Sequence, residues 1–176
     1  SLGSVSLTST DSISLPAITT VPGKTVDVNV TGSGNSITTT GNIVTGALGN
    51  ISLTADDVAL GSNLSGTGTI TLQPVDNLRV INLNTGVADG TNFNLSAVEL
   101  ARLTNGWSNI IIGKASGSVA YTNIGTTTWN DPLTLRGYYN RMQGAMTAVG
   151  NGTFNVIGMA FEFNAGNDMM TTQGQA

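Results

Sequence analysis

Apolar and polar residues alternate in short runs along most of this chain, and Gly or Asn interrupts the runs about every ten residues. Segment 26–30 reads Val-Asp-Val-Asn-Val, and segment 69–73 reads Thr-Ile-Thr-Leu-Gln. Period-two alternation bounded by turn-forming residues is typical of β-strands. The same pattern predicts further strands at 51–54, 78–83, 109–112, 118–121, 133–135 and 153–157. We therefore predict an all-β fold.

A weak internal repeat favours a solenoid over a β-sandwich. Segments 41–45, 49–54 and 68–72 each begin with Gly and continue with alternating Ile, Val or Leu. They indicate an imperfect repeat of about 20 residues, at the short end for solenoids. A sandwich needs hairpins, yet most interruptions are looser than the tight Asn-Gly or Asp-Gly turns of hairpins. We predict a parallel β-helix of roughly eight or nine coils, about 40 Å long, with Ile, Val and Leu pointing inward.

One segment, 96–103, departs from the alternation and has helical spacing. Ser96 and Glu99 stand where a capping box requires them, and Gly106 lies just past the end. We expect one short helix here, acting as a structural cover. Its apolar residues should lie on the rod or close one of its ends: Val98, Leu100 and Leu103.

The composition narrows the classes of protein to consider. Of 176 residues, 39% are apolar and 9% charged, with a net charge of −4, which argues against a disordered chain. Six Lys and Arg residues give no basic surface for nucleic acid. No apolar run approaches the ~18 residues of a membrane span. We expect a single β-solenoid domain over residues 1–176, with no nucleic-acid partner and no membrane span.

The candidates for catalytic and metal chemistry are few. The chain lacks Cys and His, so catalysis would depend on carboxylates, hydroxyls, Tyr or Lys. Asp56 and Asp57 are adjacent, and neighbours on a strand face opposite sides, so we interpret them as a turn or strand-end pair rather than a Ca²⁺ site. Asp131 precedes Pro132 and indicates a structural corner. We predict no catalytic residue, no metal and no cofactor.

The aromatic residues supply the candidate binding site. Tyr138, Tyr139 and Arg141 form a compact group outside the repeat. Aromatic faces stack on sugar rings and guanidinium groups bind hydroxyls, so we predict a glycan or partner contact here. Packing of the same residues against the rod or a neighbouring copy is the competing interpretation. We expect Trp107 to fill a gap in the core.

Two stretches of the sequence resemble a known family. Residues 49–58 read Gly-Asn-Ile-Ser-Leu-Thr-Ala-Asp-Asp-Val, and 64–74 read Leu-Ser-Gly-Thr-Gly-Thr-Ile-Thr-Leu-Gln-Pro. They resemble the large bacterial surface exoproteins of the filamentous haemagglutinin type. Further segments keep the order of the repeats in those proteins: 94–100, 110–114 and 129–135.

The resemblance covers residues 36–136 and part of the tail at 164–168, while 137–163 depart from the usual repeat. It implies a right-handed parallel β-helix that is secreted and held at the bacterial cell surface. It also implies adhesion or an extracellular scaffold, and it brings no catalytic residue. The chain would then be a segment of a larger surface exoprotein or the subunit of a fibre.

Three functions follow from these observations, in decreasing order of support. The first is a non-catalytic adhesin or structural β-solenoid segment that binds a glycan or a neighbouring cell-surface protein. The second is a subunit that assembles with further copies of itself into an extracellular fibre or sheath. The third is a polysaccharide-active β-helix enzyme, which needs two carboxylates facing one cleft. The ten scattered acidic residues favour this enzyme least.

Overall fold

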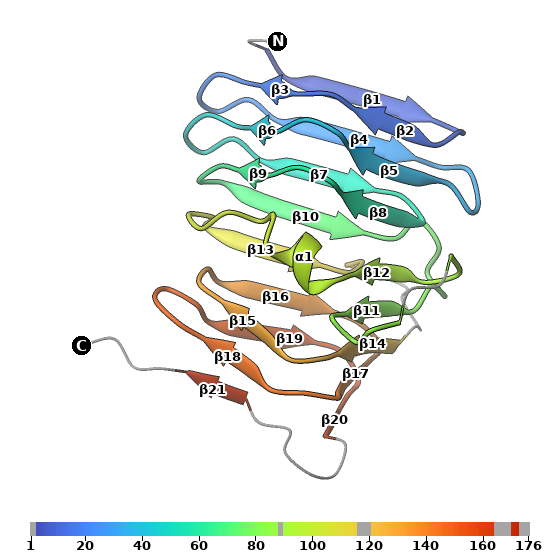
Figure 1. Ribbon diagram of the computed structural model, residues 1–176, viewed down its shortest axis with the longest axis vertical. Helices are drawn as coiled ribbons and strands as arrows, with labels where there is room; N and C mark the ends of the chain where they lie inside the picture. The colour runs from blue at the N-terminus through green and yellow to red at the C-terminus, as the bar shows by residue number, and fades with distance from the viewer. Residues whose placement is uncertain (1–2, 88–89, 116–120, 164–169, 173–176) are drawn as a thin grey trace.

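In the computed structural model the chain winds as a β-solenoid of seven coils, one for each strand of its longest sheet (Figure 1). The structure describes residues 3–87, 90–115, 121–163 and 170–172. The strands pair in parallel, most of them with their counterparts in neighbouring coils and two of them, Ile81–Leu83 and Phe93–Leu95, with each other within one coil. The faces of the rod are therefore parallel sheets. The predicted all-β fold and parallel β-solenoid are confirmed.

The first face of the rod is a sheet of seven strands, one per coil. Its strands have four or five residues and the clearest alternation in the chain, as in β4, where Val26, Val28 and Val30 are buried between polar residues. In stacking order the strands are β1 (Val5–Ser9), β4 (Val26–Val30), β7 (Ile51–Thr54), β10 (Thr69–Gln73), β13 (Asn109–Ile112), β16 (Leu133–Arg136) and β19 (Phe154–Ile157).

The second face consists of two ladders that meet at one level. The upper ladder is β2 (Ile13–Leu15), β5 (Ser36–Thr39) and β8 (Asp57–Leu60). The lower ladder is β12 (Phe93–Leu95), β11 (Ile81–Leu83), β14 (Tyr121–Ile124), β17 (Tyr139–Met142) and β20 (Ala160–Phe163). Strands β8 and β12 lie side by side, so the two ladders together continue along one face.

The third face is interrupted. Its upper ladder is β3 (Ile18–Thr19), β6 (Ile43–Val44) and β9 (Leu64–Ser65), and its lower ladder is β15 (Thr127–Trp129), β18 (Met146–Ala148) and β21 (Met170–Thr172). Between them, Leu103 forms an isolated parallel bridge with Leu64. The third face therefore lacks a full strand where the helix lies.

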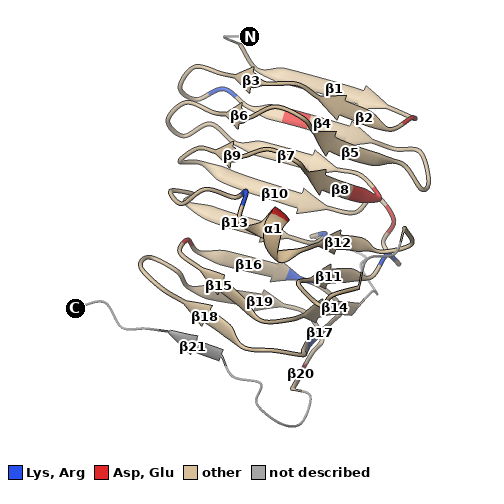
Figure 2. Cartoon of the chain, viewed as in Figure 1, with Lys and Arg blue, Asp and Glu red and all other residues tan. Residues whose placement is uncertain are grey.

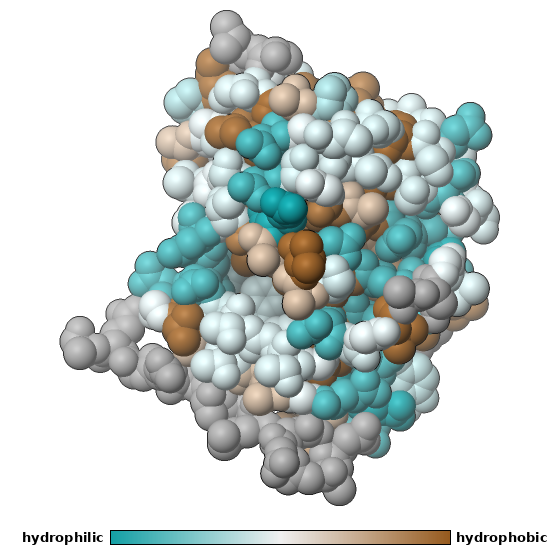
Figure 3. Space-filling model, in the orientation of Figure 1, coloured by the Kyte–Doolittle hydropathy of each residue, from teal (hydrophilic) through white to brown (hydrophobic). Residues whose placement is uncertain are grey.

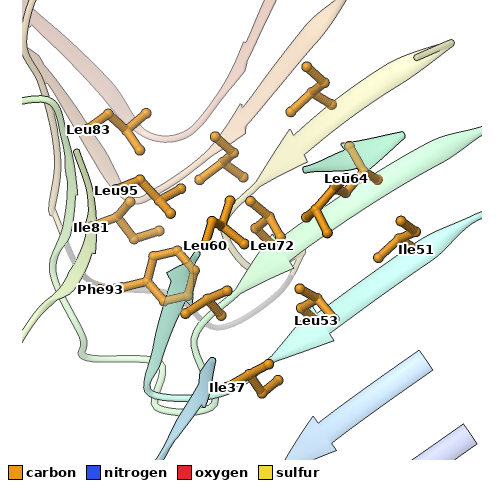
Figure 4. Close-up of a cluster of buried hydrophobic side chains, with 14 of the residues drawn as sticks. Ile37, Ile51, Leu53, Leu60, Leu64, Leu72, Ile81, Leu83, Phe93 and Leu95 are labelled. Atoms are coloured by element: carbon orange, nitrogen blue, oxygen red, sulfur yellow. The ribbon is translucent and has the colours of Figure 1, made fainter. Parts of the chain in front are cut away.

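Columns of apolar side chains fill the interior of the rod. Because pairing is in register, Val28 lies over Leu53, Leu53 over Leu72 and Leu72 over Ile112, and all four are fully buried. Figure 4 shows Leu53 and Leu72 in the same interior as Phe93 from the second face. Trp107 is also buried in this core, which confirms the prediction that it fills a gap.

One coil is twice as long as the others, which corrects the predicted number of coils. Paired first-face residues lie 21, 25, 19, 40, 23 and 21 positions apart, from Val5–Val26 to Leu133–Phe154. The 40-residue coil holds β11, β12 and the helix between Ile70 and Ile110. The prediction assumed coils of about 20 residues and therefore divided this long coil into two. The predicted number of eight or nine coils is wrong.

The predicted helix is present but shorter. Helix α1 spans Ala97–Leu100, and its capping box is complete: the Ser96 hydroxyl accepts the Glu99 backbone N–H, and the Glu99 carboxylate accepts the Ser96 N–H. Leu100 and Leu103 pack against the core in the middle of the rod. Val98 is 67% exposed, so the expectation that it would also lie on the rod is wrong; it occupies the outward side of the helix.

The predicted strands correspond mainly to the first face. Segments 26–30, 51–54, 69–73 and 109–112 match β4, β7, β10 and β13. The predictions at 78–83, 133–135 and 153–157 differ from β11, β16 and β19 only at their ends. For the prediction at 118–121, β14 begins at Tyr121, and residues 118–120 lie outside the described residues, as does the tail segment 164–168.

Candidate functional site

The structure brings Tyr138, Tyr139 and Arg141 together and adds Tyr121. Strands β14 and β17 pair so that Tyr121 lies directly beside Tyr139. Their rings stack with centroids 5.1 Å apart and an angle of 19° between planes. The Tyr138 ring meets Tyr139 edge to face at 4.7 Å and 82°. We call these three tyrosines together with Arg141 the tyrosine platform.

Arg141 is held at one side of the platform by two contacts. Its guanidinium carbon lies 5.3 Å from the centre of the Tyr121 ring, within the range of a cation–π interaction. Its Nε donates to the Glu162 carboxylate at 3.0 Å across the β17–β20 pair. Both partners of this ion pair are more than a third exposed, so it orients the guanidinium more than it stabilises the fold.

The platform is open to solvent on the second face of the rod. Tyr121 is 41% exposed and Tyr139 is 36% exposed. The two rings stack because strand pairing sets their backbones side by side, and the alternation along β14 and β17 directs both side chains outward. The arrangement offers an aromatic surface to the C–H face of a sugar ring, with N–H donors of Arg141 and carboxylate oxygens of Glu162 beside it for hydroxyls.

A ladder of asparagines fixes the neighbouring strands in register. Asn82 donates to Asn94 at 2.8 Å, and Asn123 donates to Asn82 at 2.9 Å. Because Asn123 pairs with Arg141 in the next strand, the ladder leads directly to the platform. Asn82 is buried, so these amide bonds are partly shielded from water and help to hold β14 beside β11.

Three further residues of this region, Tyr121, Asn123 and Glu162, do not stand out in the sequence. Tyr121 and Tyr139 stand 18 positions apart, and Arg141 and Glu162 stand 21 apart. These distances correspond to one coil, so a search for polar and aromatic residues one repeat apart would have joined them. The irregular coil lengths hid that spacing.

The remaining acidic candidates have structural roles, as predicted. The Asp56 carboxylate is buried and accepts the Gly34 N–H at 2.7 Å and the Arg79 guanidinium at 2.9 Å. Asp131 accepts the backbone N–H groups of Gly106 and Trp107 at 3.0–3.1 Å and fixes the corner before β16.

The surroundings of Asp57 change the pKa of its carboxyl. Burial raises the pKa of Asp57 above its usual value of 3.8, and the charge of Glu99 adds to the rise. Hydrogen bonds from the backbone of Asn94 and Val58 and the charge of Arg79 act in the opposite direction without cancelling it. The carboxylate accepts the Asn94 N–H and so bridges β8 to β12.

Metal-ligating side chains do not gather in the described part of the chain: no group of three or more Asp or Glu could hold an ion there. Figure 2 shows charged residues scattered over the coils. Over the same residues, no helix is long and apolar enough to cross a membrane.

Comparison with family models, curated proteins and solved structures finds no match to this chain. The β-solenoid is therefore established by strand pairing alone, and the resemblance to filamentous haemagglutinin-type exoproteins stays a prediction.

Proposed function

We propose that this chain is a non-catalytic, extracellular β-solenoid domain that binds glycans through the tyrosine platform. The observation that carries the proposal is the exposed stack of Tyr121 on Tyr139 with Arg141 beside it. Aromatic side chains on a solvent-facing sheet contribute little to the core, whereas they provide a ready surface for a partly apolar ligand. The secreted, cell-surface location implied by the family resemblance fits such a ligand.

A glycan array probed with the purified chain tests this proposal. We expect selective binding that falls at least tenfold in the variant Tyr121→Ala/Tyr139→Ala. The variant Tyr121→Phe/Tyr139→Phe keeps both rings and should retain most of the affinity. Leu48→Ala serves as a matched control, because Leu48 is 77% exposed and is not part of the platform.

Two results would contradict the glycan proposal. One is an array without selective binding by a folded chain, and the other is binding that the alanine variant retains. Reaction products released from a bound polysaccharide, and lost on substitution of one Asp or Glu, would instead support the polysaccharide-active enzyme.

A second candidate function, a subunit of an extracellular fibre, is favoured by the ends of the rod. At the last coil Phe154 and Val156 point inward from β19 and are only partly buried. At the first coil Val5 and Leu7 occupy the same two columns. A second copy stacked end to end would continue both columns, with Val5 next to Phe154 and Leu7 next to Val156.

A further inference from the structure

The long coil adds one strand to the second face and none to the first. Between β7 and β13 the first face has only β10. Between β8 and β14 the second face has both β12 and β11. Neighbouring strands stand about 4.8 Å apart, so the coils must separate by one strand spacing where the extra strand lies.

The third face shares this separation, and none of its described strands fills it. Among the described residues between β9 and β15, only Leu103 forms a bridge on this face. What is left is a hollow of about 420 Å³, lined on one side by α1 and residues 103–105 and on the other by residues 126–131. Figure 3 shows the surface recessed beside the helix at this level.

Backbone groups on both sides face the hollow without a partner. In β15, the Thr127 N–H bonds to Ala145 and the Trp129 C=O accepts the Val149 N–H, so both of these residues pair with β18. Successive peptide groups of a strand point to opposite sides, so the Thr128 N–H and C=O point into the hollow. They have no hydrogen-bond partner among the described residues, and the same holds for the Leu103 C=O across the gap.

The walls of the hollow suit an uncharged ligand with one apolar side. Leu100, Ile110 and Trp129 form apolar parts of the lining, and Asn84 and Asn130 are neutral. Among the described residues of the lining, only Asp131 is charged, and both of its oxygens already accept backbone N–H groups. The polar groups of the lining that remain without a hydrogen-bond partner are therefore mainly backbone N–H and C=O groups, as at the open edge of a β-sheet.

We propose that this hollow binds an extended peptide segment of a partner protein, which adds as a strand between the Leu103 bridge and β15. The segment would accept the Thr128 N–H and donate to the carbonyls of Thr128 and Leu103. It would place small or apolar residues inward and polar residues outward, as the neighbouring strands do. The bound segment would continue the third-face ladders above and below it, which distinguishes this site from the tyrosine platform. Addition of a strand to an open sheet edge is an established mode of peptide recognition.

Selection from a display library of random nonapeptides on the intact chain tests the proposal. We expect enriched peptides with alternating apolar and polar residues. Their affinity should fall at least tenfold for Thr128→Pro. This substitution removes the N–H that points into the hollow and leaves the hydrogen bonds of Thr127 and Trp129 to β18 in place. Thr128→Val removes the hydroxyl and keeps the N–H, so this control should bind like the parent chain.

Two further measurements keep the test independent of how Thr128→Pro folds. Ala101→Trp places a large ring in the hollow from the helix side and should also abolish binding. A selected peptide N-methylated at alternate residues should lose affinity in one of its two methylation patterns. Equal affinity for the parent chain, Thr128→Pro and Ala101→Trp would overturn the proposal, as would the absence of enriched peptides. Self-association lost in Thr128→Pro would identify a second copy as the occupant and also overturn it.

Discussion

At the scale of single residues, Asp57 shows how pairing between coils changes the chemistry of a side chain. The carboxylate lies at the start of β8, where β12 covers it and its oxygen accepts the Asn94 N–H. Asp57 is therefore partly buried, and this burial is the largest cause of its raised pKa.

This pKa change predicts how stability depends on pH. Because the folded-state pKa of Asp57 lies above the unfolded value of 3.8, the folded chain binds the proton more tightly. Ionisation above the folded-state pKa therefore lowers the free energy of unfolding. Asp57→Asn keeps an acceptor for Asn94 but lacks the charge, so we expect it to be more stable than the parent chain at pH 7.

Urea unfolding of both chains between pH 3 and pH 7 measures this effect. The advantage of Asp57→Asn should shrink as the pH falls through the folded-state pKa and vanish below about 3.8. Asp11→Asn, at an exposed position, is the control and should show no such advantage. An advantage for Asp57→Asn that is constant over this pH range would contradict the prediction.

At the scale of elements, the ion pair between Arg79 and Asp56 connects the third coil to the long fourth coil. Arg79 precedes β11, and Asp56 stands at the bend before β8. The pair is 2.9 Å long, and its side chains are only 10% and 3% exposed. The Arg79 Nε and Nη1 atoms are buried without partners among the described residues, so the pair has a large desolvation cost.

We expect Arg79→Met to lower the free energy of unfolding by about 3–5 kcal/mol, because it leaves the Asp56 carboxylate buried without its counter-charge. Asp56→Asn/Arg79→Met removes both charges and keeps an acceptor for the Gly34 N–H. The double variant should therefore be at least about 2 kcal/mol more stable than Arg79→Met alone. Denaturant unfolding measures both values, and an equal loss in the two variants would show that the charge left on Asp56 is not the cause.

Elements of the first face could be predicted from the sequence, and most of the others could not. Strand β10 has five residues with clear alternation and a Gly-rich approach, whereas β9 is only Leu64–Ser65. A strand of two residues is too short to show alternation of apolar and polar positions. On the second face, Asn140 of β17 points inward and is buried, so a polar residue stands where the alternation would require an apolar one.

The candidate site was predicted in part for the same reason. Tyr138, Tyr139 and Arg141 are neighbours in the sequence and were found together. Tyr121 joins them only through the register of β14 on β17, and the hollow beside β15 arises from an unequal number of strands on different faces. Both features depend on pairing between coils, which an irregular repeat does not reveal.

At the scale of the whole molecule, the rod has a direction and two different ends. The upper edge of β1 and the lower edge of β19 end the first-face sheet. Beside β19, a hollow of about 540 Å³ is lined by apolar residues that include Phe161 and Phe163 of β20. Parallel strands give each end a different surface, and the apolar columns continue from one copy to the next when the last coil of one copy meets the first coil of another. Such head-to-tail contacts extend into filaments rather than closed dimers.

End-to-end stacking is tested by blocking one end at a time. Leu7→Lys places a charge in the first coil, and Val156→Lys places one in the last. The association constant of each variant with itself should fall at least about 100-fold, because stacking would bury an unpaired charge. The parent chain should lengthen with concentration in sedimentation velocity. A mixture of the two variants should form heterodimers and nothing longer, because each variant retains one intact end.

Val44→Lys, at an exposed position in the second coil, should assemble like the parent chain. A parent chain that stays monomeric, or a mixture that forms no heterodimer, would exclude this stacking and leave the rod as a binding domain that acts alone.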